Sequence, residues 1–106
     1  MKAFELSKEA KEDLRKIARF TEKRWGRDQR FLYIKQFDDV FHSLAKNPSI
    51  GKKCEYIKKG YRKFPQSSHI IFYRKVESNK IFVVRILHKN MDVESKLYTH
   101  SALVSG

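Results

Sequence analysis

Apolar residues recur at helical spacing through the first half of the chain. After a short alternating stretch at residues 3–6, which predicts a first strand, Ser7 is a favourable N-cap residue. Apolar positions three or four residues apart then predict an amphipathic helix from Ser7 to Trp25, and Gly26 suits its C-terminal end. A second helical pattern runs from Arg27 to Lys46, where Asn47 and Pro48 end it. Two helices joined by one glycine predict a hairpin, and we expect both apolar stripes, including Trp25 and Phe31, to face the core.

In the second half of the chain the period of the apolar positions changes to two. This pattern predicts strands at residues 61–65, 69–76 and 80–87, with Ser78 and Asn79 as the turn of a hairpin. Residues 49–60 carry four lysines without a clear period and predict a basic loop with one turn of structure. The hairpin turn sets a register in which Phe72 lies opposite Arg85 and Tyr73 opposite Val84. The order β-α-α-β-β-β predicts an α+β fold, with the N-terminal helical hairpin packed on one face of an antiparallel sheet.

Two arginines interrupt the apolar strands. We expect Ile70, Phe72 and Val76 to form the core face of their strand, which leaves Arg74 as a misfit at the sheet margin. Arg85 falls in the middle of a strand that is apolar on both faces. A buried arginine needs a carboxylate or several carbonyl partners. Arg85 therefore pairs with an acidic residue, such as Asp92 or one on a helix, or else forms a recessed anion site.

Size and charge limit the possible classes of protein. The chain has 106 residues, which suits one domain at residues 1–92 followed by a polar tail at 93–106. The net charge is +12, with +4 in residues 1–46 and +8 in residues 47–106. Such an excess attracts nucleic acid, an acidic protein segment or an anionic membrane surface. The N-terminus lacks an apolar signal region, and the longest strongly apolar run is too short to span a bilayer, so we expect a cytoplasmic protein.

The candidate chemistry is modest. Cys54 is the only cysteine, and its neighbours Lys52 and Lys53 favour a lowered thiol pKa, which is a weak signal for a nucleophile. The four histidines and one cysteine have no zinc-type spacing, and no glycine-rich phosphate loop is present, so we expect no metal or cofactor.

A metal-independent ribonuclease site can be assembled from the strand residues. Such a site needs a proton carrier and cations for the phosphorane, and His88, Arg62 and Arg85, with Tyr73, supply these side-chain types. His69 and His88 fit a structural role equally well.

The lysine-rich run from Lys52 to Lys63 gives a third interpretation. Its basic residues alternate with Tyr56 and Tyr61, a pattern that suits phosphate contact with base stacking. The same pattern is also typical of a solvated loop.

Six short motifs give the chain a family resemblance. They occur in order along residues 1–93 and read L-S-x-x-A-x-x-D-L (6–14), R-W-G (24–26), N-P-x-I-G (47–51), G-Y-R-K-F-P (60–65), S-H-I-I-F-Y (68–73) and R-I-L-H-K-N-M-D (85–92). In this order and spacing the chain resembles the ParE branch of the RelE/ParE superfamily of bacterial type II toxins.

The resemblance implies a toxin that binds DNA gyrase, stabilises the cleaved-DNA complex and blocks replication, without chemistry of its own. It implies DNA contact only through the gyrase complex, no membrane partner, and a ParD-like antitoxin whose disordered acidic segment folds over the toxin. The positions expected to contact the antitoxin or the target share a place in or beside the strands: Arg62, Tyr73, Arg74, Arg85, His88 and Asp92.

Relatives that cleave mRNA on the ribosome supply the alternative function. Mapped on this chain, His88 would carry protons, and Arg62 and Arg85 would hold the phosphate. Three departures weaken this interpretation: Tyr98 lies in the tail, the central strands carry no acidic residue, and the apolar Leu87 precedes His88.

Overall fold

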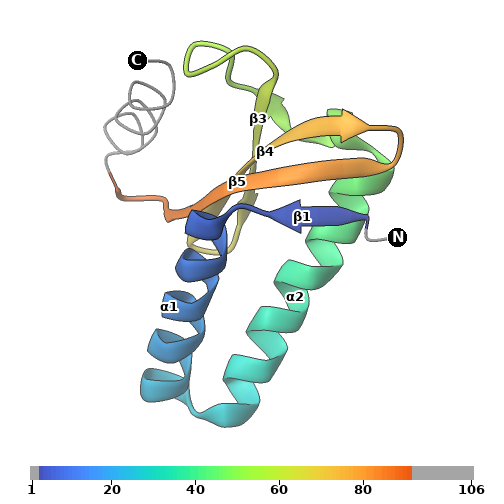
Figure 1. Ribbon diagram of the computed structural model, residues 1–106. Coiled ribbons are helices and arrows are strands. Elements are labelled where there is room, and N and C mark those ends of the chain that lie inside the picture. The colour runs from blue at the N-terminus through green and yellow to red at the C-terminus, as the bar shows by residue number, and fades with distance from the viewer. Residues whose placement is uncertain (1–2, 92–106) are drawn as a thin grey trace.

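The computed structural model describes residues 3–91, in which two helices pack on one face of a five-stranded sheet (Figure 1). The elements are β1 (Phe4–Leu6), α1 (Lys8–Trp25), α2 (Arg27–Lys46), the 3-10 helix η1 (Pro48–Ile50), β2 (Lys52–Lys53), β3 (Tyr61–Gln66), β4 (His69–Glu77) and β5 (Lys80–His88). The α+β class and the hairpin on one face of the sheet are confirmed. Asp92 and the tail at 93–106 lie outside the described residues. Within residues 3–91, neither helix has the length and apolar character needed to cross a membrane.

The sheet differs from the prediction in the direction of one strand. Its order is β1-β5-β4-β3-β2, and β1 runs parallel to β5, whereas the other pairs are antiparallel. The sheet is therefore mixed. Two parallel neighbouring strands need a long crossover connection, and the segment from α1 to β4 provides it between β1 and β5. The predicted basic loop also contains the short strand β2, which pairs with β3 at the far edge.

The helix ends follow the sequence closely. Ser7 has extended backbone angles, and its Oγ accepts a hydrogen bond from Ala10 N–H at 2.9 Å. At the other end, Gly26 has φ +98°, and its N–H donates to the Glu22 carbonyl at 2.8 Å. Since this positive φ favours glycine, Gly26 both ends α1 and allows α2 to begin at the next residue.

Two irregularities shift the register of the β4–β5 hairpin, one between Lys75 and Glu77 and one between Phe72 and Tyr73. Phe72 lies opposite Arg85 as predicted, but Tyr73 lies opposite Val83 and not Val84. The extra residue in β5 is accommodated between these two pairs, and a turn-based register cannot anticipate it.

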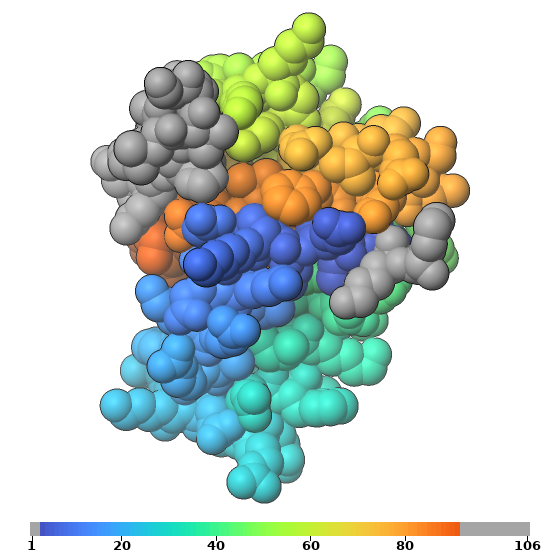
Figure 2. Space-filling model, viewed as in Figure 1, coloured from blue at the N-terminus to red at the C-terminus, as the bar shows by residue number. Residues whose placement is uncertain are grey.

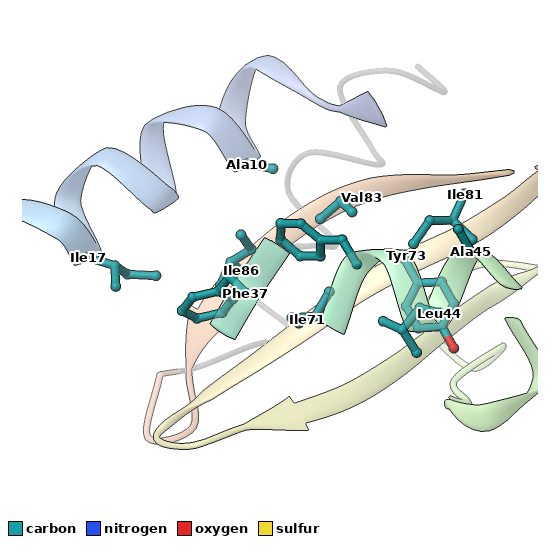
Figure 3. Packing of buried hydrophobic residues seen from close by; sticks show 11 residues of the cluster. Ala10, Ile17, Phe37, Leu44, Ala45, Ile71, Tyr73, Ile81, Val83 and Ile86 are labelled. Atoms are coloured by element: carbon teal, nitrogen blue, oxygen red, sulfur yellow. The ribbon is translucent and has the colours of Figure 1, made fainter. Parts of the chain in front are cut away.

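The apolar side chains form two clusters, one on each face of the sheet. The main core lies between the helices and the sheet and includes Ile71 and Tyr73, both fully buried (Figure 3). The predicted core face of β4 is the opposite one: Phe72 and Ile70 belong to the second cluster, and Val76 is 40% exposed. Both faces of β4 are apolar near its start, so alternation alone could not identify the face that the helices cover.

The tip of the helical hairpin extends beyond the sheet (Figure 1). Trp25 is 65% exposed and Phe31 is 69% exposed, so the prediction that both are core residues is wrong. Their helical spacing is correct, but no strand lies beside this part of the hairpin to cover them.

Tyr73 connects the sheet to the segment that follows α2. Its hydroxyl donates to the Pro48 carbonyl at 2.7 Å and accepts the Gly51 N–H at 2.9 Å. A side chain at Gly51 would overlap the Tyr73 ring and hydroxyl. The N-P-x-I-G motif therefore supplies the hydrogen-bond partners and the space for a buried tyrosine.

Asp13 connects α1 to β5. Its two carboxylate oxygens accept from Arg85 Nε at 2.8 Å and Arg85 Nη2 at 2.9 Å, and Oδ2 also accepts the Ile86 N–H at 3.0 Å. The two side chains are only 11% and 17% exposed. Of the roles predicted for Arg85, the structure shows pairing with a helix acid.

Substitution of Tyr73 by Phe tests the first connection. The Gly51 N–H and the Pro48 carbonyl would lose their partner inside the protein, so we expect the free energy of unfolding to fall by about 1–3 kcal/mol. Urea denaturation followed by circular dichroism measures this change. The exposed Tyr56→Phe is the control and should change stability by less than about 0.5 kcal/mol. Equal losses in the two variants would contradict the proposed role of Tyr73.

Substitution of Asp13 by Ala tests the second connection. It leaves the Arg85 guanidinium largely buried without its carboxylate, and we expect a loss of about 3 kcal/mol in the free energy of unfolding. The neighbouring Glu12→Ala removes two exposed ion pairs, with Arg15 and Arg19, and should change stability by less than about 1 kcal/mol. In the double variant Asp13→Ala/Arg85→Met, the loss should be smaller than the sum of the two single losses by about 1 kcal/mol or more. Additive losses would show that the pair is not coupled.

Candidate functional site

A groove of about 790 Å³ opens between the helical hairpin and the ends of the strands. One wall is α1, from Asp13 to Trp25, and the opposite wall is formed by the β3–β4 turn and the end of β5. Its apolar lining includes Ile17, Phe20, Trp25, Ile86 and Met91. Phe20 is 64% exposed and Met91 is 46% exposed, so this apolar surface is open to solvent. Exposed aromatic side chains around a concavity are typical of a binding site.

Two histidines lie side by side in the wall of the groove. His69 on β4 pairs with His88 on β5, and their ring centroids are 5.4 Å apart with the rings nearly perpendicular. His69 Nδ1 lies 3.1 Å from the Tyr33 hydroxyl of α2, within hydrogen-bond distance. His88 Nδ1 accepts the Asn90 N–H at 3.1 Å, which leaves Nε2 as the protonated nitrogen of the neutral ring.

Burial affects the charge of His69. Desolvation lowers the pKa of His69 below its ordinary value, and the neighbouring His88 lowers it further, whereas Asp13 acts in the opposite direction. The lowered pKa favours the neutral ring of His69, which shares the groove wall with Tyr33.

The six predicted contact residues do not gather at one place. His88 lines the groove, and Arg85 borders it through Asp13. Arg62 lies near the start of β3 and does not line the groove. Its Nη1 donates to the Gly51 carbonyl at 2.7 Å.

The remaining predicted contacts lie elsewhere. Arg74 is exposed, with its guanidinium 5.1 Å from the centre of the Phe82 ring. Tyr73 is fully buried, so it presents no surface to a partner in this conformation. Asp92 lies outside the described residues.

The strand register separates the residues of the ribonuclease hypothesis. Arg62 pairs with Tyr73, and His88 pairs with His69, four positions earlier on β4. At about 3.3 Å per residue this places the two side chains roughly 13 Å apart along the strands, on strands that are not neighbours. Arg85 donates its Nε and Nη2 hydrogens to Asp13, so these two nitrogens are not free to hold a phosphate.

Neither Cys54 nor a cluster of metal ligands forms a reactive site in residues 3–91. Cys54 is fully buried, and desolvation raises the pKa of its thiol, with Lys63 opposing this shift. The expected lowering by Lys52 and Lys53 is therefore wrong, because burial outweighs the nearby cations. Within residues 3–91 no three His, Cys, Asp or Glu side chains come together to hold a metal ion.

Sequence reasoning missed the aromatic and apolar part of the groove. The helical spacing that predicts α1 places Trp25 in the core and does not single out Phe20. A usable signal was present, since an 18-residue helix is about 27 Å long and exceeds the width of a short sheet. Aromatic residues near the tip of such a hairpin are therefore candidates for exposed contact residues.

Comparison with known proteins identifies relatives over most of the chain. The family model described as the ParE toxin of the type II toxin-antitoxin system, parDE, matches residues 4–93. Toxin ParE1 of Mycobacterium tuberculosis is 41% identical over 92 residues, which cover 87% of this chain and 94% of the relative. Toxin ParE1 of Caulobacter vibrioides is 33% identical over 97 residues, covering 92% of this chain and 99% of the relative.

A solved structure shares the fold. The chain from the chromosomal ParDE TA system from P. aeruginosa superposes with a TM-score of 0.66 at 15% identity, covering 80% of this chain and 92% of that one. The family model spans the whole sheet and both helices, and it includes the groove described above. The chain belongs to the ParE toxin family of type II toxin–antitoxin systems.

Proposed function

We propose that this protein acts in the cytoplasm by binding DNA gyrase and stabilising its cleaved-DNA complex, without chemistry of its own. The observation that carries the proposal is the open groove with exposed aromatic residues, since such a surface is suited to protein recognition. The positions of Arg62 and Arg85 support it further. Both guanidinium groups are held by internal acceptors, the Gly51 carbonyl and the Asp13 carboxylate, and neither is positioned with His88 around a phosphate.

We propose in addition that a cognate antitoxin neutralises the toxin by placing an amphipathic segment in the groove. The lining is apolar at Ile17, Phe20 and Trp25, and Lys16 lies at the same wall. A segment with apolar residues on one side and Asp or Glu on the other would complement both features. A disordered acidic segment that folds on binding suits a partner with a net charge of +12.

The alternative function, cleavage of mRNA on the ribosome, is supported by fewer observations. His88 lines the groove, and His69 lies beside it. These two rings could move a proton, but the cations expected beside them are engaged elsewhere.

Paired assays on the purified protein distinguish the two functions. We expect the protein to inhibit supercoiling by gyrase and to increase the linear DNA released on denaturing the enzyme, while mRNA in ribosome complexes stays intact. His88→Ala should likewise leave the mRNA intact. Site-specific mRNA cleavage that disappears in His88→Ala would overturn the proposal in favour of the ribonuclease.

Two phenylalanines of similar exposure test the antitoxin site. Phe20 lines the groove and is 64% exposed, whereas Phe31 is 69% exposed and is not part of the lining. We expect Phe20→Ala to weaken binding of the antitoxin about 30-fold, as for an interface hot spot of about 2 kcal/mol. Phe31→Ala should change the affinity less than about threefold on the same scale.

Isothermal titration calorimetry can measure both affinities, using the antitoxin encoded by the neighbouring reading frame. Thermal unfolding of each variant verifies that it is folded. Equal effects of the two substitutions, or a larger effect at Phe31, would show that the antitoxin does not use the groove.

A further inference from the structure

The face of the sheet turned away from the helices carries a group of cations, of which Lys52 and Arg74 are exposed and Lys63 is half-buried. Tyr61 and Phe72 of the second cluster identify this face. Strand register places Lys52 opposite Lys63, and Lys63 opposite Phe72, while Arg74 lies opposite Tyr61, so all three cations share the face. In Figures 1 and 2 the loop between β2 and β3, coloured lime, likewise projects on the side away from the helices. We call Lys52, Lys63 and Arg74 the open-face cations.

No carboxylate neutralises these cations within residues 3–91. The ion pairs of this part of the chain lie on the helices, between Lys80 and the glutamates beside it, or between α1 and β5. From position 47 to position 91 the sequence has 11 Lys and Arg residues and only two acidic ones, Glu55 and Glu77. The excess charge of the chain is therefore concentrated on the sheet and the loop beside it, where it is available to an anionic partner.

Aromatic rings hold two of the open-face cations in place. Lys63 Nζ lies 5.8 Å from the centre of the Tyr56 ring and donates to the Tyr56 hydroxyl at 3.2 Å. The Arg74 guanidinium lies 5.1 Å from the centre of the Phe82 ring. Cation–π contacts restrict long side chains without neutralising their charge. Less side-chain entropy is then lost when an anion binds.

We propose that the open face binds the phosphate backbone of duplex DNA directly, through Lys52, Lys63 and Arg74. Backbone contact requires cations at the surface and does not require a pocket. An acidic peptide is a less suitable partner for the open face, because the groove that could hold a peptide lies on the helix side of the sheet. The exposed edge strand β2 is also too short, at two residues, to pair with an added strand. The choice of duplex DNA over RNA rests on the proposed action on gyrase, whose substrate is duplex DNA.

The test is equilibrium binding of the purified chain to a short fluorescent duplex, measured by anisotropy at several salt concentrations. The triple variant Lys52→Gln/Lys63→Gln/Arg74→Gln should bind at least about tenfold more weakly at low salt. Its plot of log affinity against log salt should be shallower by up to about 2.7, because each phosphate contact contributes about 0.9 to the slope.

The matched control removes the same charge from the helices. Lys11→Gln/Lys23→Gln/Arg27→Gln changes three exposed cations that are absent from the ion pairs of residues 3–91. This variant should keep the salt slope and bind DNA within about threefold of the parent. Thermal unfolding verifies that both triple variants are folded.

Three outcomes would overturn the proposal. The first is equal weakening by the two triple variants, since net charge alone would then explain binding. The second is absence of DNA binding by the parent protein at low salt. The third is tighter binding of an RNA duplex or a polyglutamate peptide of the same charge. Gyrase is absent from this assay, so failure here leaves gyrase inhibition standing, and failure of gyrase inhibition leaves a measured DNA affinity standing.

Discussion

The outer edge of β5 is the constraint on which the rest of the structure depends. β1 pairs with β5 only as far as Leu6 and Val83, so the remaining half of β5 would expose unpaired backbone groups. The start of α1 covers this edge. Ser7 N–H donates to the Val83 carbonyl, Ser7 Oγ donates to the Val84 carbonyl, and Asp13 accepts the Ile86 N–H. Since Asp13 also binds Arg85, the same carboxylate fixes α1 to the sheet and places one wall of the groove.

The motifs that carry the family resemblance are mostly pairs of contacts within the fold. L-S-x-x-A-x-x-D-L supplies Ser7 and Asp13, which both bind the strand of the R-I-L-H motif. N-P-x-I-G supplies the Pro48 carbonyl and Gly51, which receive the last residue of S-H-I-I-F-Y, Tyr73. In this chain these residues hold the architecture together. They do not by themselves locate the surface that acts on a target.

The local parts of the fold were predictable from the sequence, and the parts set by distant contacts were not. Helix ends followed from Ser7 and Gly26, whose effects reach one turn. The parallel direction of β1 and the helix acid that binds Arg85 depend on segments more than 70 residues apart. The groove was missed for the same reason: helical periodicity placed Trp25 and Phe31 on apolar stripes, but only the width of the sheet decides how much of each stripe is covered.

The two proposed binding surfaces lie on opposite sides of the sheet. The groove is bounded by the helices, where the lowered pKa of His69 favours its neutral ring and the lining is largely apolar. The open face carries Lys52, Lys63 and Arg74, and within residues 3–91 the element packed on it is the loop that holds Cys54 and Ile57. Because the sheet separates them, an antitoxin segment in the groove would not cover Lys52, Lys63 or Arg74. Under the two proposals, an antitoxin in the groove would block the binding of gyrase and would leave the proposed DNA contact of the open face in place.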